Sequence, residues 1–340
     1  MNPVRLAFIN TGLVAPVGLS APAACAAFRA KLTNPSETRF KGSDGEWLMA
    51  HQVALEQPWR GIAKLARMAA MAIEEALEGI PPVEWTRIPL VLCVAEPQRP
   101  GRIDGLEDQL FLDIQELLGA SFSPHSRIVA HGRVGPAVAM HHARSLIDAG
   151  EATRVLVAAT DSFVLGATLG YYEREDRLLT AENSNGFMPG EGAGALLVGE
   201  SQGVAGELVC DGLGFAREAA TVALDEPLRG DGLTQAMKAA LQDAGWGREG
   251  KRFRIADLSG EQYYFKEASL ALSRAIPQRK DDWELWHPAE CMGEAGAASA
   301  MACLVAGHAA AAKGYAPAPE AIVHFSSDEG TRAVVLMREA

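Results

Sequence analysis

The sequence predicts an α/β fold built from two similar halves, and three observations lead to this prediction. Short apolar, β-branched runs alternate along the 340 residues with segments whose apolar residues recur at helical spacing. The same alternation runs through 1–203 and again through 204–340, which indicates an internal duplication. Strands that alternate with helices favour parallel or mixed sheets covered by helices. We therefore expect two similar halves, 1–203 and 204–340.

The first half contains alternating strands and helices with recognisable ends. It begins with a strand-like run at 4–12, and the helix that follows has Ser20 as its expected N-cap. The strand expected at 88–96 is short and contains β-branched residues, as in a buried sheet. The expected helices are 21–32, 61–79, 105–119 and 135–150, and the other expected strands are 126–132, 154–162 and 193–200.

The second half repeats this rhythm. Its most unusual segment is a helix at 293–314, rich in Ala and Gly, whose small side chains allow close packing on all sides. Such a helix suits the centre of a layered structure. The other expected elements are strands at 203–215 and 252–260, helices at 232–245 and 265–276, a Trp-rich strand or loop at 281–291, and two strands within 321–339.

Composition and charge exclude several classes of function. The chain is 48% hydrophobic and 22% charged, which is the balance of an ordinary globular protein. A net charge of −12 argues against a general nucleic-acid or anionic-membrane surface, because like charges repel. The N-terminal segment lacks the pattern of a signal peptide, and no run of 18 apolar residues occurs. We expect a cytoplasmic protein without membrane insertion.

The five cysteines indicate a reducing compartment. Their number is odd, their spacing is scattered and no C-x-x-C occurs, which excludes a disulfide framework or a zinc ribbon. Four have apolar neighbours and are expected to be small core residues. These four are Cys25, Cys93, Cys210 and Cys303.

The most specific motif is NGFMPGEGAGALLV at 185–198. Its glycines permit a tight turn and a close approach of backbones, and Glu191 is expected to be a buried structural carboxylate with backbone partners. The segment resembles the strand-turn-strand of the β-ketoacyl synthases, members of the thiolase superfamily. The glycines expected to be structural here are Gly186, Gly190, Gly192 and Gly194.

Four further segments, in the same order as in that family, extend the resemblance over most of the chain. They are VRLAFINTGLVAPVGLSAPAACAAFRAKL, ARSLIDAGEATRVLVAATDS, ECMGEAGAASAMACL and HFSSDEGTRAVVL. Gly293, Gly296 and Gly330 lie at glycine positions of the matched segments. The resemblance implies the thiolase fold, in which two duplicated βαβαβ-type halves form an αβαβα sandwich.

The family's catalytic residues are absent at the matching positions. Its chemistry uses a cysteine thiolate at a helix N-terminus, two histidines and an aromatic gating loop. Counting along the matched segments places Arg133 at the cysteine, Ser259 or Leu258 at the first histidine and Glu290 at the second. Arginine stays protonated and cannot be an acyl nucleophile. The gating loop reads SSDE in place of aromatic residues. The resemblance therefore implies a retained architecture without condensing activity.

The substitutions suggest an ion pair and leave two alternative reactive residues. Arg133 and Glu290 would face each other across the old cavity, since a buried arginine needs an acidic partner. Cys291 is a candidate nucleophile, because a helix start would lower its pKa. His131 is a second candidate, although a partly exposed histidine at a strand end is the simpler interpretation.

No metal or cofactor is implied. His141 and His142 are adjacent on a helix and point about 100° apart, which does not form a metal pair. The spacing of Asp282, His287, Glu290 and Cys291 matches no tetrahedral site.

Two classes of function follow from the resemblance, beside the simpler reading of an α/β domain unrelated to thiolases. The first is an inactive, protein-binding or structural accessory subunit, either an adaptor for a secretion-system effector or a partner of an active ketosynthase. It would be a homodimer or a heterodimer with a homologue, paired through the strand edge at 154–162. The second is an acyl-thioester-binding acyltransferase, decarboxylase or hydrolase that uses Cys291, His131 or Glu290.

Overall fold

The computed structural model describes residues 4–247, 250–276 and 283–340. Within these ranges the strands form one mixed ten-stranded sheet and a separate two-stranded hairpin. The first half of the chain contributes β1 (Leu6–Val14), β4 (Leu90–Val94), β5 (Arg127–Ala130), β6 (Arg154–Ser162) and β7 (Glu191–Glu200) to the large sheet. The second half contributes β8 (Leu208–Arg217), β9 (Arg252–Ala256), β10 (Leu285–Trp286), β11 (Glu320–Ser326) and β12 (Thr331–Glu339).

The two halves of the sheet have the same topology. The strand order is β10-β9-β11-β12-β8-β1-β7-β6-β4-β5. Each half contributes five strands. Numbered along the chain within each half, they lie in the order 3-2-4-5-1 from the outer edge of the sheet to its middle. In both halves the outer three strands are parallel and the next two pairings are antiparallel. The halves join where β1 pairs with β8, Leu6 opposite Cys210. This repetition confirms the predicted duplicated fold. The boundary at 203 and 204 stays a prediction, and it falls between β7 and β8.

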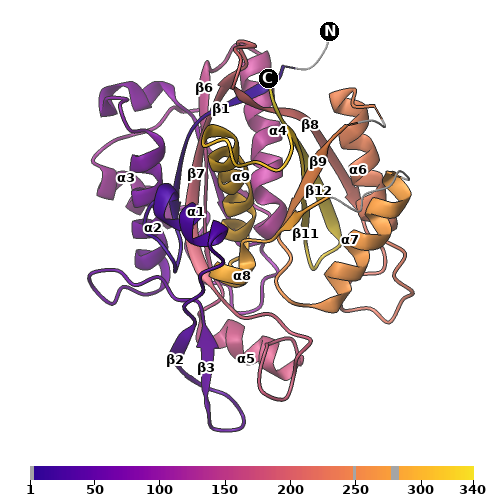
Figure 1. Cartoon of the computed structure of the whole chain (residues 1–340). Coiled ribbons are helices and arrows are strands. Elements are labelled where there is room, and N and C mark those ends of the chain that lie inside the picture. The colour runs from indigo at the N-terminus through magenta and orange to yellow at the C-terminus, as the bar shows by residue number, and fades with distance from the viewer. Residues whose placement is uncertain (1–3, 248–249, 277–282) are drawn as a thin grey trace.

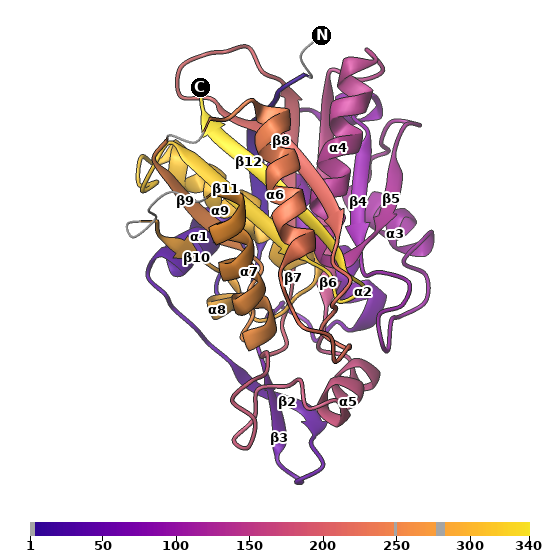
Figure 2. The same ribbon diagram turned by 90° about the vertical axis from the view of Figure 1, so that its right-hand side faces the viewer.

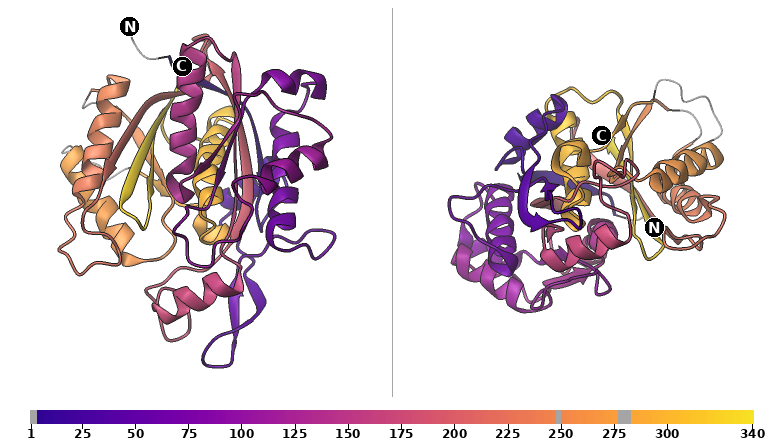
Figure 3. Two further views of the ribbon diagram at one scale, coloured as in Figure 1. Left: turned by 180° about the vertical axis from the view of Figure 1, so that it is seen from behind. Right: turned by 90° about the horizontal axis from the view of Figure 1, so that it is seen from below.

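Helices form three layers around the two halves of the sheet (Figures 1 and 3). The central layer consists of α4 (Gly135–Asp148) and α9 (Ala297–Ala312), which contact strands of both halves. The outer layers consist of α2 (Gly61–Ala76) and α3 (Gln109–Leu118) on one side, and α6 (Asp231–Ala244) and α7 (Gln262–Ala275) on the other. The arrangement is an αβαβα sandwich. The shorter helices are α1 (Ala21–Arg29), α5 (Gly166–Arg174), α8 (Ala289–Met292), η1 (Pro82–Arg87) and η2 (Gly132–Val134).

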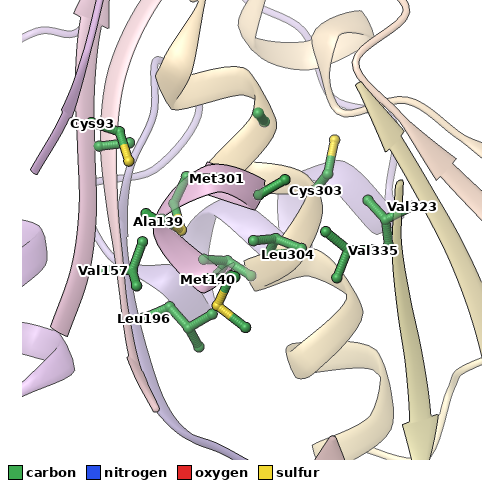
Figure 4. Close-up of a cluster of buried hydrophobic side chains, with 14 of the residues drawn as sticks. Cys93, Ala139, Met140, Val157, Leu196, Met301, Cys303, Leu304, Val323 and Val335 are labelled. Atoms are coloured by element: carbon green, nitrogen blue, oxygen red, sulfur yellow. The ribbon is translucent and has the colours of Figure 1, made fainter. Parts of the chain in front are cut away.

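The core runs continuously through the central layer. Met301 and Leu304 of α9 and Met140 of α4 lie in one buried cluster with the sheet residues Leu196 and Val335 (Figure 4). Because α9 is made almost wholly of small apolar residues, its first ten positions are buried. The expectation of a central, small-residue helix at 293–314 is thereby confirmed, and the structure begins it at Ala297. All five cysteines are buried as free thiols, including the four predicted core residues.

Among the elements of the first half that were not predicted are the hairpin of β2 (Ser36–Lys41) and β3 (Trp47–Ala50), and the helix α5. The hairpin and α5 lie together at one end of the molecule, away from the central layer (Figure 2). In the part of the chain that the structure describes, no helix combines the length and the apolar character needed to span a bilayer.

The predicted dimer edge at 154–162 is wrong. These residues are β6, which pairs with β7 on one side and with β4 on the other. An interior strand has no free backbone groups to offer a partner. The sheet edge nearest to α4 is β5.

Candidate functional site

The position expected for a nucleophile is occupied by a buried arginine that forms ion pairs. Arg133 lies in η2, in the short turn between the end of β5 and the start of α4, and is 7% exposed. Its Nη2 donates to the hydroxyl of Tyr264 at 2.9 Å and to Asp328, and its Nη1 lies 3.4 Å from Oε2 of Glu294. The guanidinium also stacks over the Tyr264 ring, 4.6 Å from its centroid. The Arg133 side chain therefore fills the position at the start of the central helix.

Glu294 links the residues expected at the nucleophile position and at the first-histidine position. It lies in the turn between α8 and α9, where its Oε1 accepts from the backbone N–H of Gly296 at 2.9 Å. Its Oε2 accepts from the hydroxyl of Ser259 at 2.8 Å, just beyond the end of β9. The structure thus brings Arg133 and Ser259 to one carboxylate. Leu258, the other residue counted at the first-histidine position, is buried in the apolar core below α6 and α7.

The predicted ion pair between Arg133 and Glu290 is wrong, although the expectation of an acidic partner holds. Glu290 lies on α8, where it is 3.1 Å from Nε2 of His287 and 3.9 Å from Nζ of Lys31. Four residues further on, Glu294 is the carboxylate that turns inward. The count went wrong because α8 ends at Met292, and Gly293 reverses the chain with φ of +72°.

The former gating loop contributes an aspartate to the same network. Asp328 lies in the turn between β11 and β12, and its carboxylate accepts from Arg133, Tyr264 and Arg177. Burial alone would raise the pKa of Asp328, but the two arginines outweigh burial and hold it well below its usual range. Arg177 is also held by a bidentate pair with Glu261, at 2.7 and 2.8 Å. The loop is therefore tied to the cavity by charge instead of closing it with aromatic rings.

A third arginine extends the network toward β6. Arg99 makes a bidentate pair with Glu96, with both bonds at 2.7 Å, and lies 3.3 Å from Asp161. Asp161 also accepts from the backbone N–H of Ala297, at the start of α9. We call the whole set the ion-pair cluster. Its members are the arginines Arg99, Arg133 and Arg177 and the carboxylates Glu96, Asp161, Glu261, Glu294 and Asp328.

Little space remains inside the ion-pair cluster. The cavity between Arg99, Arg133 and Asp328 measures about 10 Å³. A volume of that size holds about one water molecule. An acyl chain therefore has no room between these described side chains in this conformation.

The chemistry available at this site is poor in nucleophiles. The hydroxyl of Tyr264 donates to Asp328, and burial raises its pKa well above the usual value. Ser259 donates to Glu294, whose Oε2 also faces Arg133. Asp257 accepts from the backbone N–H of Ser326, and burial raises its pKa to about 7.

The other candidate reactive residues lie outside the ion-pair cluster. Cys291 lines a separate pocket beside α1 and α8, and burial together with Glu290 raises its pKa to about 11. The expected lowering of its pKa is wrong, because the four-residue helix α8 supplies little field and the thiol is buried. His131 is exposed at the end of β5, in agreement with the simpler interpretation. Of the four residues considered as a metal cluster, Asp282 lies outside the described residues. Among all residues that the structure describes, no group of three or more His, Cys, Asp or Glu side chains is arranged to hold a metal ion.

The motif at 185–198 positions the backbone around the cluster. Glu191 is buried and accepts from the backbone N–H of Val53 and the hydroxyl of Ser162, and it pairs with Lys64. A Cβ on Gly190 would lie 1.9 Å from the carbonyl oxygen of Met292. The other glycines singled out in the sequence also lie where a Cβ would meet neighbouring atoms, and they are Gly186, Gly192, Gly194, Gly293, Gly296 and Gly330.

The sequence analysis did not single out Glu294 and Arg177 of the ion-pair cluster, nor Tyr264, which is hydrogen-bonded to it. Asp328 was noted only as part of SSDE. One signal was available for Glu294, since it is the acid directly after the matched Gly293. Arg177 and Tyr264 carried no local signal, because only the fold brings their segments together.

The fold and the site together define a class of protein: a thiolase-fold protein that carries an ion-pair cluster at the start of its central helices. No protein-family model and no curated protein sequence matches the chain. The likeness therefore rests on solved structures.

Three solved structures share this fold over 99% of the chain. One is a complex of a type II PKS acyl-carrier protein with its ketosynthase bound to the hexaketide, with a TM-score of 0.83, 18% identity and all of that chain covered. Another is the ishigamide ketosynthase/chain length factor, with a TM-score of 0.82, 17% identity and all of that chain covered. The third is an oxazolomycin ketosynthase domain from Streptomyces albus, with a TM-score of 0.81, 12% identity and 75% of that chain covered.

Proposed function

We propose that this protein is a catalytically inactive ketosynthase-fold protein that acts as a protein-binding accessory subunit. One observation carries the proposal: the position where the resemblance expects the nucleophile holds Arg133, buried and paired with Glu294 and Asp328. A protonated guanidinium cannot attack a thioester. The residues around it leave about 10 Å³ of space.

The proposed role is that of a partner for an active ketosynthase. The names of two similar structures support this choice, since one contains a chain length factor and the other an acyl-carrier protein complex. The strand β5 adds support, because it is a short edge strand beside α4 and offers unpaired backbone groups to a second subunit. An adaptor for a secreted effector would use the same fold, but no feature of the described surface favours it.

The test of inactivity is incubation with an acyl-CoA and with malonyl-CoA, followed by intact mass spectrometry and measurement of released CoA. An active ketosynthase run in parallel serves as the positive control. We expect no adduct and no CoA release above the protein-free rate. An adduct on Cys291, or release of CoA, would establish the alternative of an acyl-thioester-processing enzyme.

The accessory role has its own test. Affinity purification from the native host, followed by light scattering, is expected to give a stoichiometric complex with a ketosynthase. A protein recovered only as a monomer or a homodimer would contradict that role while leaving the inactivity intact.

A further inference from the structure

A pocket separate from the ion-pair cluster lies beside α1 and α8. Its volume is about 510 Å³, within the range of small-molecule sites. It is enclosed by α1, β10, α8, α9 and the segment after α9. Figure 1 shows α1 in front of α9 with α8 below it, and Figure 2 shows β10 near α8. We call it the α1–α8 pocket. It shares no lining residue with the cavity inside the ion-pair cluster.

The walls of the α1–α8 pocket are aromatic and apolar. Trp286 packs on Phe253 with ring centroids 4.9 Å apart, and its ring lies 6.1 Å from that of Tyr315 at an interplanar angle of 32°. Phe28 of α1 lines the same pocket. Flat rings held in this way form a surface on which an aromatic ligand can stack.

Two buried thiols form part of the lining. Burial raises the pKa of Cys25 to about 12 and that of Cys291 to about 11. Both thiols are therefore protonated at neutral pH and behave as small apolar groups. The pocket is thus suited to non-covalent binding.

The charged side chains at the rim differ in whether they already have polar partners. Glu284 accepts from Nε1 of Trp286 at 3.0 Å, and Glu290 faces both His287 and Lys31. In contrast, the guanidinium of Arg29 lies 4.6 Å above the Tyr315 ring, and no salt bridge to it occurs among the described residues. The hydrogen-bond donors of Arg29 therefore remain free for an anion at the edge of the pocket.

Lys31 is a second cation at the rim. Its side chain is 79% exposed, and its Nζ lies 3.9 Å from Oε2 of Glu290. Lys31 follows α1 with φ of +54°, a left-handed conformation that usually selects glycine after a helix.

We propose that the α1–α8 pocket binds an amphipathic carboxylate whose flat apolar body stacks on Trp286 and Tyr315 and whose carboxylate is held by Arg29 and Lys31. This inference does not depend on the proposed function, because the pocket and the ion-pair cluster are separate.

The test compares three probes of the same shape by isothermal titration calorimetry: naphthylacetate, naphthylethanol and naphthylethylamine. We expect naphthylacetate to bind about tenfold more tightly than naphthylethanol, because one charge-assisted hydrogen bond contributes about that difference in affinity. Naphthylethylamine should bind most weakly, because its ammonium group would face Arg29 and Lys31. Equal binding of all three probes, preferential binding of the amine, or no binding of naphthylacetate would overturn the proposal.

Two variants locate the binding site without disturbing the fold. Lys31→Gly removes the charge and suits the left-handed backbone, and Arg29→Gln removes the guanidinium from the surface. Each is expected to weaken naphthylacetate binding about fivefold to tenfold, while the alcohol binds as before. The matched control is Lys238→Gln, which removes the same charge at an exposed position of α6. It should leave binding unchanged. Unaltered naphthylacetate affinity in both pocket variants would place the ligand elsewhere and refute the site.

Discussion

Replacing Asp328 with asparagine tests whether the ion-pair cluster stabilises the protein. Asn keeps the shape of the side chain but removes the negative charge that faces Arg133 and Arg177. Breaking a buried ion pair costs about 3–5 kcal/mol, because the remaining charge is left without its partner. The side chain of Asp328 is 27% exposed, and both arginines keep a second carboxylate, so we expect a loss near the lower limit, about 3 kcal/mol.

Urea denaturation at pH 7 is the appropriate assay, since urea carries no charge and does not screen ion pairs as guanidinium chloride does. The control is Asp148→Asn, at an exposed aspartate at the end of α4, which should change stability by less than about 0.5 kcal/mol. A double-mutant cycle with Arg177→Met should show a coupling of about 1–3 kcal/mol. A loss for Asp328→Asn below about 1 kcal/mol, or no coupling, would refute the reasoning.

The pH dependence gives an additional check on the same residue. The pKa of Asp328 is depressed in the folded protein, so its contribution is complete above the unfolded value of about 4 and is lost as pH falls through the folded value. The stability difference between the wild-type protein and Asp328→Asn should therefore be constant from pH 5 to pH 8 and shrink in stronger acid.

Three further predictions concern other parts of the structure. The pKa of Asp257 is raised to about 7 in the folded protein, so protonation of Asp257 favours folding. Its contribution to the free energy of unfolding, about 4 kcal/mol at most, is complete below about pH 4 and is lost as pH rises to about 7. Urea titrations from pH 4 to pH 8 should show that Asp257→Asn lacks this loss, whereas parallel curves would contradict the assignment. Gly190→Ala should cost about 3 kcal/mol or more, since its Cβ would overlap the carbonyl oxygen of Met292, while Gly170→Ala on α5 should be neutral or stabilising in thermal melts. Cys291 should resist iodoacetamide at pH 7.5 and react once urea unfolds the chain, as read by mass spectrometry; rapid labelling of the native protein would show the pKa assignment to be wrong.

Most of the fold could be predicted because the buried strands and the central helix leave strong local patterns. The run at 90–94 is apolar throughout since β4 is covered on both faces, and 293–314 is rich in Ala because α9 is covered on nearly all sides. The first strand of the hairpin at 36–50 is mostly polar, and few side chains of either strand are buried. Its sequence therefore resembles that of a loop. The neighbours of 154–162 depend on strand order, which no local pattern encodes, and the predicted free edge was therefore misplaced.

The site was harder to predict than the fold, because its contacts join residues far apart in sequence. The burial of the Arg133 charge correctly predicted an acidic partner, but counting along the sequence placed that partner at Glu290. That count treats 290–296 as one regular segment, whereas Gly293 and Gly296 both adopt positive φ and separate α8 from α9. The reversal sends Glu290 to the α1–α8 pocket and Glu294 to the cluster.

The balance of charge within the ion-pair cluster explains why a single substitution would not restore a thiol-based centre. Three arginines face five carboxylates, and burial already raises the pKa of Asp161 and Glu261. Replacing Arg133 by cysteine would remove the cation that Glu294 and Asp328 share, and their charges would repel a thiolate formed between them. The new thiol would therefore have a raised pKa and remain unreactive at neutral pH. On the proposed function, ketosynthase chemistry at this site would require the acids at 294 and 328 to change together with Arg133, so these three residues act as a unit.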